Sequence, residues 1–206
     1  MFTLENLKLS LGGRDIISIP KLEIAAGNHL LLLGPSGCGK TSLMNLLAGL
    51  LRPTSGEIRF KGQPYSSLSD SGIDALRAKN FGFVFQRLHL IGHLTTLQNI
   101  ALAQPKRDEE RIKSLIRDLG LEGKQNRKAR DLSVGEAQRV ALARAVANNP
   151  SVIFADEPTS ALDDKNAAAA MDMLFSQVQK TKATLIVATH DERIKPRFSN
   201  VMEMAA

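Results

Sequence analysis

The stretch Gly34–Thr41, with the sequence Gly-Pro-Ser-Gly-Cys-Gly-Lys-Thr, decides the fold. It fits the pattern G-x-x-x-x-G-K-[ST], in which glycines let successive backbone amides curl round an anion without a Cβ clash. In this pattern Lys40 reaches the β- and γ-phosphates of a nucleotide, and the Thr41 hydroxyl ligates Mg²⁺. The apolar run Leu30–Leu33 predicts a buried parallel strand before the loop, and the apolar spacing of Ser42–Leu50 predicts a helix after it. Strand, loop and helix N-terminus together predict a phosphate site that the helix dipole favours.

Two acids end a second apolar run. Ser151–Ala155 predicts a buried strand that delivers Asp156 and Glu157 to its carboxyl end, where open α/β sheets bind ligands. An Asp at this place holds Mg²⁺ through water, and a Glu one residue later would act as general base, an effect worth ~10²–10⁴-fold in rate. The alternative is an acid pair that only caps the following turn. A third β-rich run, Ala183–Thr189, ends at His190.

The segment Leu132–Glu136 predicts the start of a helix. Ser133 can accept a hydrogen bond from the Glu136 amide, and Glu136 can reach back to the Ser133 amide, which is a capping box. The helix runs over Val134–Ala147, rich in good helix formers, and stops before Pro150. Its N-terminus would present free amides and a hydroxyl to an anion.

Taken in order, these segments resemble the motifs of the ATP-binding cassette (ABC) superfamily. Gly34–Thr41 is similar to its P-loop, Phe85-Gln86 to its Q-loop, Leu132–Glu136 to its signature and Ser160–Asp163 to its D-loop. The short single cassette resembles the ATPases of lipoprotein-release and macrolide-export systems, although importer ATPases share much of the pattern. The resemblance implies a subunit that hydrolyses ATP with Mg²⁺, dimerises head to tail on ATP and drives a separate integral membrane permease.

The same resemblance implies a role for each matching residue. ATP binding falls to Gly34, Pro35, Ser36, Gly37, Cys38, Gly39, Lys40, Thr41, Ser42 and Gln86. The resemblance implies catalytic roles for Lys40, Glu157 and His190, with His190 at the γ-phosphate. It implies that Thr41, Gln86 and Asp156 bind Mg²⁺. The signature residues Ser133, Gly135 and Glu136 would act on the ATP held by the partner, and Asp163 of the D-loop would lie across the dimer interface.

The chain departs from the family pattern at three positions. Val134 stands where a Gly is usual, and Glu136 replaces the commoner Gln. Leu11 stands before Gly12-Gly13, where the family usually has an aromatic residue that stacks on adenine. We therefore expect weak base stacking and modest discrimination between ATP and GTP.

The expected fold class is α/β: a P-loop NTPase core with an N-terminal antiparallel β subdomain and an inserted helical subdomain. Alternating apolar residues predict the antiparallel part, and the polar, Ser-rich segment 63–80 predicts a surface loop. The whole chain, 1–206, forms one nucleotide-binding domain. We expect residues 1–88 and 150–206 to form the ATP-binding core and 89–149 the helical subdomain that carries the signature.

Composition narrows the setting of the chain. No apolar run approaches the ~20 residues that span a bilayer, and no signal peptide is evident, so any membrane role needs a partner. A single cysteine agrees with a reducing compartment. The net charge of +6 predicts mainly solvated charge. We expect a cytoplasmic protein, peripheral on the cytoplasmic face of the inner or plasma membrane, as a homodimer or heterodimer and without nucleic acid.

Three other functions compete with this interpretation. A nucleic-acid- or ribosome-acting ABC ATPase would carry a long coiled-coil insertion or two cassettes, and the sequence has neither. A P-loop kinase for a small metabolite would not need Glu157, His190 and the signature. A degenerate cassette that only scaffolds a complex would not keep Lys40 and Asp156. The transported substrate, the direction of transport and the choice between homodimer and heterodimer stay open.

Overall fold

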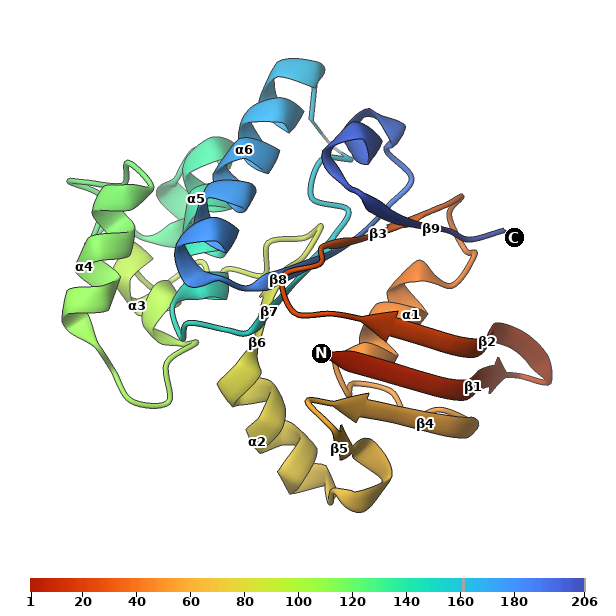
Figure 1. The fold of residues 1–206 in the computed structure, drawn as a ribbon. Helices are drawn as coiled ribbons and strands as arrows, with labels where there is room; N and C mark the ends of the chain where they lie inside the picture. The colour runs from red at the N-terminus through yellow and green to blue at the C-terminus, as the bar shows by residue number, and fades with distance from the viewer. Residues whose placement is uncertain (161, 206) are drawn as a thin grey trace. The chain divides into compact units, whose positions relative to one another are not determined.

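The computed structural model describes residues 1–160 and 162–205. It divides the chain into two compact units, Met1–Arg77 with Thr184–Ala206, and Ala78–Ala183. The first unit therefore joins the two ends of the chain, and the second is a continuous segment between them (Figure 1). The finer division into an ATP-binding core and a helical subdomain stays a prediction.

An antiparallel sheet fills the N-terminal part of the first unit. Its strands are β1 (Phe2–Leu11), β2 (Arg14–Ile24), β4 (Ser55–Phe60) and β5 (Gln63–Pro64), in the order β2-β1-β4-β5. Alternate side chains of β1 are buried, which is the pattern of a sheet with one face against a core. The expected antiparallel subdomain is present.

Parallel strands carry the rest of the first unit. Strand β3 (Leu30–Leu33) lies between β8 (Thr184–Thr189) and β9 (Asn200–Glu203), parallel to both. All four β3 leucines are buried, so the predicted buried parallel strand is confirmed. Strand β3 ends at Leu33, and helix α1 (Lys40–Leu47) follows it. The loop between them, residues 34–39, belongs to the Gly-rich stretch.

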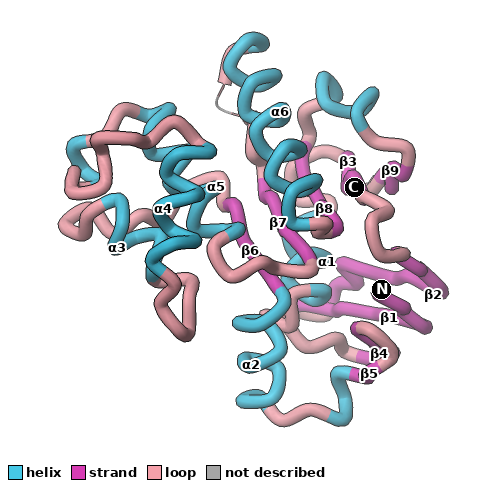
Figure 2. The backbone as a smooth tube through the Cα atoms, turned by 60° about the vertical axis from the view of Figure 1, so that its left-hand side comes forward, coloured by secondary structure: helices cyan, strands magenta, loops and turns pink. Residues whose placement is uncertain are grey.

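The second unit packs helices against a pair of parallel strands. The strands are β6 (Phe81–Val84) and β7 (Val152–Asp156), and the helices are α3 (Thr96–Ala101), α4 (Glu109–Asp118), α5 (Val134–Val146) and α6 (Asp164–Thr181). Helix α5 lies at the centre, where it packs on α3, α4, α6 and β6 (Figure 2). Contact with β6 is close: a Cβ at Gly82 would lie 2.0 Å from the Ala145 carbonyl oxygen. Within the described residues, no helix is long and apolar enough to cross a membrane.

One expectation about local structure is wrong. The segment 63–80 is not a surface loop, because it contains β5, a 3₁₀ turn and helix α2 (Asp70–Asn80). Ser69 starts this helix: its carbonyl accepts from the Ile73 amide at 2.9 Å and its hydroxyl from the Gly72 amide at 3.2 Å. The Ile73 side chain is buried, and the Arg77 guanidinium donates to the Gly49 carbonyl oxygen at 2.9 Å, so an apolar and a polar contact hold this helix on the fold.

Candidate functional site

The Gly-rich loop is shaped by close backbone contacts within the first unit. A Cβ at Gly34 would lie 2.3 Å from the Met204 carbonyl oxygen, so only glycine fits there. Gly39 has a φ of 97° and a Cβ there would lie 3.2 Å from the Ile16 carbonyl oxygen. The residues after β9 and at the start of β2 therefore pack closely against the loop. Glycine is required at both of its ends, Gly34 and Gly39.

Lys40 places a positive charge inside this loop. Its side chain is 6% exposed, and Nζ donates hydrogen bonds of 2.8 Å to the carbonyl oxygens of Gly34 and Pro35. Gly39, the N-cap of α1, provides no capping side chain. A helix N-terminus without a side-chain cap and with an ammonium in the preceding loop fits a phosphate group. Cys38 is buried, with its sulfur 4.0 Å from Lys40 Nζ, while Thr41 is exposed.

The structure brings the end of β8 to the same loop. The Gly34 amide donates to the carbonyl of Thr189, the last residue of β8, at 3.3 Å. His190 follows directly and is exposed. The buried Asp191 next to it binds the Arg193 guanidinium, with Nε–Oδ1 and Nη2–Oδ2 distances of 2.7 Å. His190 therefore lies in a turn that the Asp191–Arg193 ion pair stabilises, next to the first residue of the Gly-rich loop.

In the second unit, the structure brings Gln86 and the two acids together. Strands β6 and β7 run parallel, with Val84 opposite Ala155, so Gln86 and Asp156-Glu157 leave neighbouring strands at their carboxyl ends. Gln86, Glu157 and Ser160 line one pocket, closed on its other sides by apolar side chains of α5 and α6. The pocket has a cavity of about 70 Å³, enough for several water molecules. Glu157 itself is half-buried and has a φ of 48°.

The predicted capping box at the start of α5 is confirmed. The Glu136 amide donates to Ser133 Oγ at 3.3 Å, and Glu136 Oε2 accepts from the Ser133 amide at 2.8 Å. Lys124 forms an ion pair of 2.9 Å with the Glu136 carboxylate. That pair, helped by the Ser133 amide, lowers the pKa of Glu136 to about 2. Val134 is 72% exposed, so the N-terminal end of α5 is accessible to solvent.

The predicted D-loop is a helix cap in this structure. Asp163 begins α6, and its Oδ1 accepts from the Asn166 amide at 2.9 Å. Ala161 lies outside the described residues. Capping does not exclude the interface role that the resemblance implies for Asp163, which stays a prediction.

Two structural residues escaped the sequence interpretation. Arg144 of α5 donates to the carbonyl oxygens of Leu88 and His89, each at 2.6 Å, and so holds the chain that follows Gln86. Asn99 of α3 is fully buried; its Oδ1 accepts from the Ile91 amide at 2.8 Å and its Nδ2 donates to three backbone carbonyls. Neither helix is uniformly apolar, so no local pattern marks these two residues.

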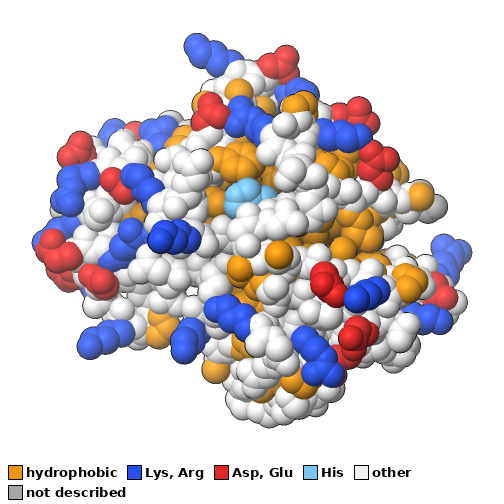
Figure 3. All heavy atoms as spheres, viewed as in Figure 1, with side chains coloured by type: hydrophobic (Ala, Val, Ile, Leu, Met, Phe, Trp, Pro, Cys, Tyr) orange, Lys and Arg blue, Asp and Glu red, His pale blue; other side chains and the backbone are white. Residues whose placement is uncertain are grey.

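Charge on the surface is mixed. On the face drawn in Figure 3, Lys and Arg side chains alternate with Asp and Glu rather than forming one basic stripe. A continuous basic stripe is the footprint of a nucleic-acid-binding surface. This face therefore agrees with solvated charge.

Comparisons with known proteins show the family of the chain. The chain matches the model of the ABC transporter family over residues 17–160, more than half its length. It is 42% identical over 189 residues to an uncharacterized ABC transporter ATP-binding protein, MJ1508, of Methanocaldococcus jannaschii, covering 89% of this chain and 84% of that protein. It is 39% identical over 198 residues to the lipoprotein-releasing system ATP-binding protein LolD of Syntrophotalea carbinolica, covering 93% and 87%.

The structure of the chain is also similar to solved structures of ABC cassettes. The dimeric structure of a post-hydrolysis state of the ATP-binding cassette MJ0796, bound to ADP and Pi, matches with a TM-score of 0.85 and 32% identity. The match covers 99% of this chain and 94% of that chain. The chain therefore belongs to the ABC transporter family and is an ATP-hydrolysing, nucleotide-binding subunit.

Proposed function

We propose that Lys40, Glu157 and His190 carry out ATP hydrolysis in this chain. Lys40 and the amides at the start of α1 bind the phosphates, and His190 contacts the γ-phosphate. Glu157 takes a proton from the attacking water while the water oxygen bonds to the γ-phosphorus. The bond from the γ-phosphorus to the bridging oxygen breaks, and ADP and phosphate result. The confined position of Lys40 and the half-buried Glu157 at a strand end support these roles.

The metal ligands that we propose are Thr41, Gln86 and Asp156. Among the described residues, no group of three or more His, Cys, Asp or Glu side chains is placed to hold a metal ion. This agrees with Mg²⁺, which keeps several waters and binds through one or two carboxylates together with substrate phosphates. A hydroxyl, an amide and one carboxylate are the oxygen donors that such an ion prefers. When bound, Mg²⁺ would neutralise the charge that develops on the phosphate oxygens.

We further propose that the signature acts on a nucleotide held by a second cassette. The observation that carries this proposal is the exposed, capped N-terminus of α5, in a unit separate from the phosphate loop. An exposed second helix N-terminus, with a serine hydroxyl at its cap, is explained if each chain completes the other's site across a head-to-tail dimer. Ser133 and Gly135 of one chain would then face the γ-phosphate on the other, with Glu136 holding Ser133 in place.

The decisive experiment on chemistry is Glu157→Gln, which keeps the size of the side chain and removes the base. We expect hydrolysis to fall by ~10²–10⁴-fold because a general base contributes that much. ATP binding should remain, and an ATP-bound dimer should accumulate in gel filtration. Asp108→Asn is a matched control, since it makes the same acid-to-amide change at the N-cap of α4, where Asp108 Oδ1 accepts from the Arg111 amide at 2.9 Å. Wild-type turnover by Glu157→Gln would exclude the base role.

The shared site needs a test of its own. Cysteines at Ser36 and Ser133, in a Cys38→Ser background, should crosslink between chains only when ATP is present. Mixing Lys40→Ala with Ser133→Arg should restore part of the activity, because a mixed dimer keeps one intact site. Crosslinks confined to single chains would rule out the head-to-tail arrangement.

The partner and location that we propose follow from the family and from similarity to LolD. The chain would work as a homodimer or heterodimer on an integral membrane permease, at the cytoplasmic face of the membrane, in a system of the lipoprotein-release or macrolide-export type. Where a neighbouring reading frame encodes a multi-span permease, co-expression with it should carry the chain into the membrane fraction. Recovery only in the soluble fraction would contradict this.

A further inference from the structure

Glu157 has a backbone conformation that needs support. Its φ of 48° lies in the left-handed region, which a residue with a Cβ adopts at an energetic cost. Such conformations persist where the surroundings hold them, and they gather at functional sites. The direction of the Glu157 carboxylate depends on this backbone, so whatever fixes the backbone also aims the carboxylate.

Ser160 provides that support. Its hydroxyl donates to the Glu157 carbonyl oxygen at 3.2 Å, and its amide approaches the same oxygen at 3.5 Å. One residue therefore closes the turn that begins at Glu157. Ser160 is itself half-buried and lines the same pocket as Glu157.

Gln86 completes a chain of hydrogen bonds. Its side-chain amide Nε2 donates to Ser160 Oγ at 3.3 Å. A serine hydroxyl can accept and donate at once, and here it accepts from Gln86 while donating to the Glu157 carbonyl. Hydrogen bonds linked in this way strengthen one another through polarisation. The three residues lie in one unit, so the chain does not depend on how the two units are placed.

We propose that Ser160 is a positioning residue that couples the side chain of Gln86 to the orientation of Glu157. When the Gln86 amide donates to Ser160 Oγ, the hydroxyl hydrogen points at the Glu157 carbonyl and the turn is held. When the Gln86 side chain binds another partner, the Ser160 hydroxyl is no longer oriented by it. The Glu157 carboxylate then loses its fixed orientation. This inference rests on the proposed base role of Glu157 and adds to it a residue that never touches the nucleotide.

The first test compares Ser160→Ala with one variant that keeps a hydroxyl and with one control. Ser160→Ala should lower kcat by ~10–100-fold, since a misplacement of about 1 Å costs up to that much. KM and the Kd for ATP should change less than ~2-fold, because Ser160 is not one of the proposed ATP-binding residues and Gln86 keeps its own side chain. Ser160→Thr keeps a hydroxyl and should recover most of kcat. Ser151→Ala is the control: it removes a hydroxyl that bonds Asn80 Oδ1 at 3.3 Å in the same unit, and should leave kcat unchanged.

The second test asks whether Gln86 and Ser160 act as one unit. If they do, Gln86→Ala combined with Ser160→Ala should be no slower than the slower single variant. If the two act independently, their losses in kcat multiply, and the proposal is overturned. Ser160→Cys, with its weaker donor, gives the same comparison should the alanine variant fail to fold.

The outcomes separate this proposal from the one on which it rests. Wild-type kcat in Ser160→Ala, with Glu157→Gln inactive, overturns the positioning role and leaves the base in place. Turnover in Glu157→Gln overturns the base itself. A purely structural role predicts a lower Tm and an equal loss of ATP binding, and that result also refutes the coupling.

Discussion

Ser133→Ala separates the two duties of the signature serine, one as helix cap and one as a phosphate contact. The substitution removes the hydroxyl that accepts from the Glu136 amide at 3.3 Å and keeps the reciprocal bond of 2.8 Å to the Ser133 amide. Loss of a cap costs ~0.5–2 kcal/mol, and because half of this box survives we expect about 1 kcal/mol. For a chain of this size that lowers Tm by ~2–4 °C.

A matched control lies in the same unit. Helix α3 begins with a capping box of the same kind, in which the Gln98 amide donates to Thr95 Oγ1 at 3.2 Å and Gln98 Oε1 accepts from the Thr95 amide at 2.9 Å. Thr95→Ala should therefore cost the same stability. It should leave hydrolysis untouched, because the resemblance gives this cap no nucleotide to contact.

Activity then distinguishes the two caps. A hydrogen bond to a charged phosphate contributes ~1.5–3 kcal/mol, so Ser133→Ala should lower kcat/KM by ~10–100-fold. The assay is steady-state phosphate release, with thermal unfolding of both variants alongside. Equal Tm losses with full activity in both variants would refute the phosphate role of Ser133.

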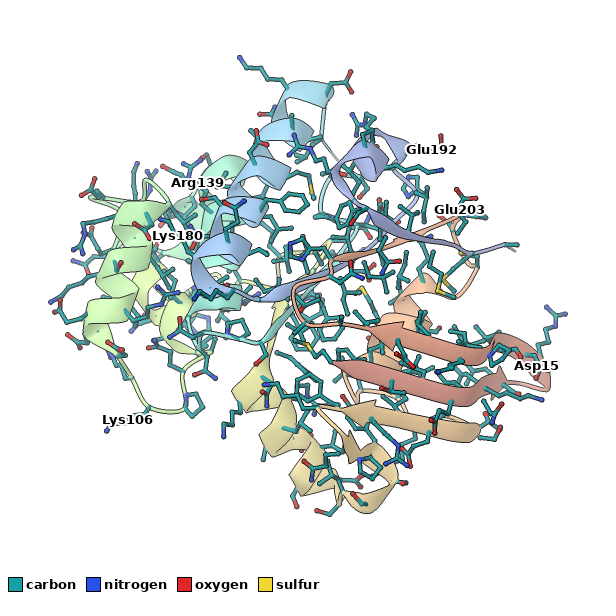
Figure 4. All side chains as sticks on the ribbon, viewed as in Figure 1. Asp15, Lys106, Arg139, Lys180, Glu192 and Glu203 are labelled. Atoms are coloured by element: carbon teal, nitrogen blue, oxygen red, sulfur yellow. The ribbon has the colours of Figure 1, made fainter. Side chains whose placement is uncertain are left out.

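Three further outcomes follow from the geometry. Leu11 is 51% exposed at the end of the β1–β2 hairpin, where Asp15 of β2 lies opposite Ser10 (Figure 4), so Leu11→Tyr should tighten ATP in a titration by ~1–3 kcal/mol if the base lies there. Asn99→Ala should lower the free energy of unfolding by ~2–3 kcal/mol in urea, because the Ile91 amide loses its partner; an unchanged midpoint would contradict this. Burial lowers the pKa of His29 below its ordinary 6.5, and its Nδ1 accepts from the Leu185 amide, so the neutral form stabilises the fold. That contribution is present above pH 6.5 and is lost as pH falls through the lower pKa of the folded state, so urea midpoints should fall on acidification, and less steeply in His29→Gln.

The sequence predicts what short-range rules govern. Leu30–Leu33 is apolar throughout and bounded by a Gly-rich loop, so its burial in a parallel sheet follows from composition alone. The Ser133 box follows from a spacing of three residues. The helix in segment 63–80 differs from the prediction because serines are common in loops, while the contacts that hold this helix are distant: the buried Ile73, and Arg77, whose carbonyl partner Gly49 lies 28 residues away.

The bonds that tune the site are beyond such rules. Gln86 is 74 residues from Ser160, and Arg144 is 56 residues from Leu88. Nothing local marks a serine in a turn as the partner of a distant amide, because the pairing arises only when β6 and β7 lie side by side. The residue types at the candidate site could thus be predicted from the sequence. The long-range hydrogen bonds of Gln86 and Arg144 could not.

The Arg144 guanidinium has a consequence for how such chains change length over evolutionary time. Surface loops usually accept insertions, since lengthening a loop costs little entropy. An extra residue before Leu88 would carry both bonded carbonyls away from Arg144, so insertions there should be purged. The loop that carries Lys106, which points outward in Figure 4, is held at Gln104 by the Ala147 carbonyl oxygen at 3.0 Å, and its residues 105–107 are exposed. Insertions and deletions in related sequences should therefore gather around Lys106 and avoid the four positions after Phe85.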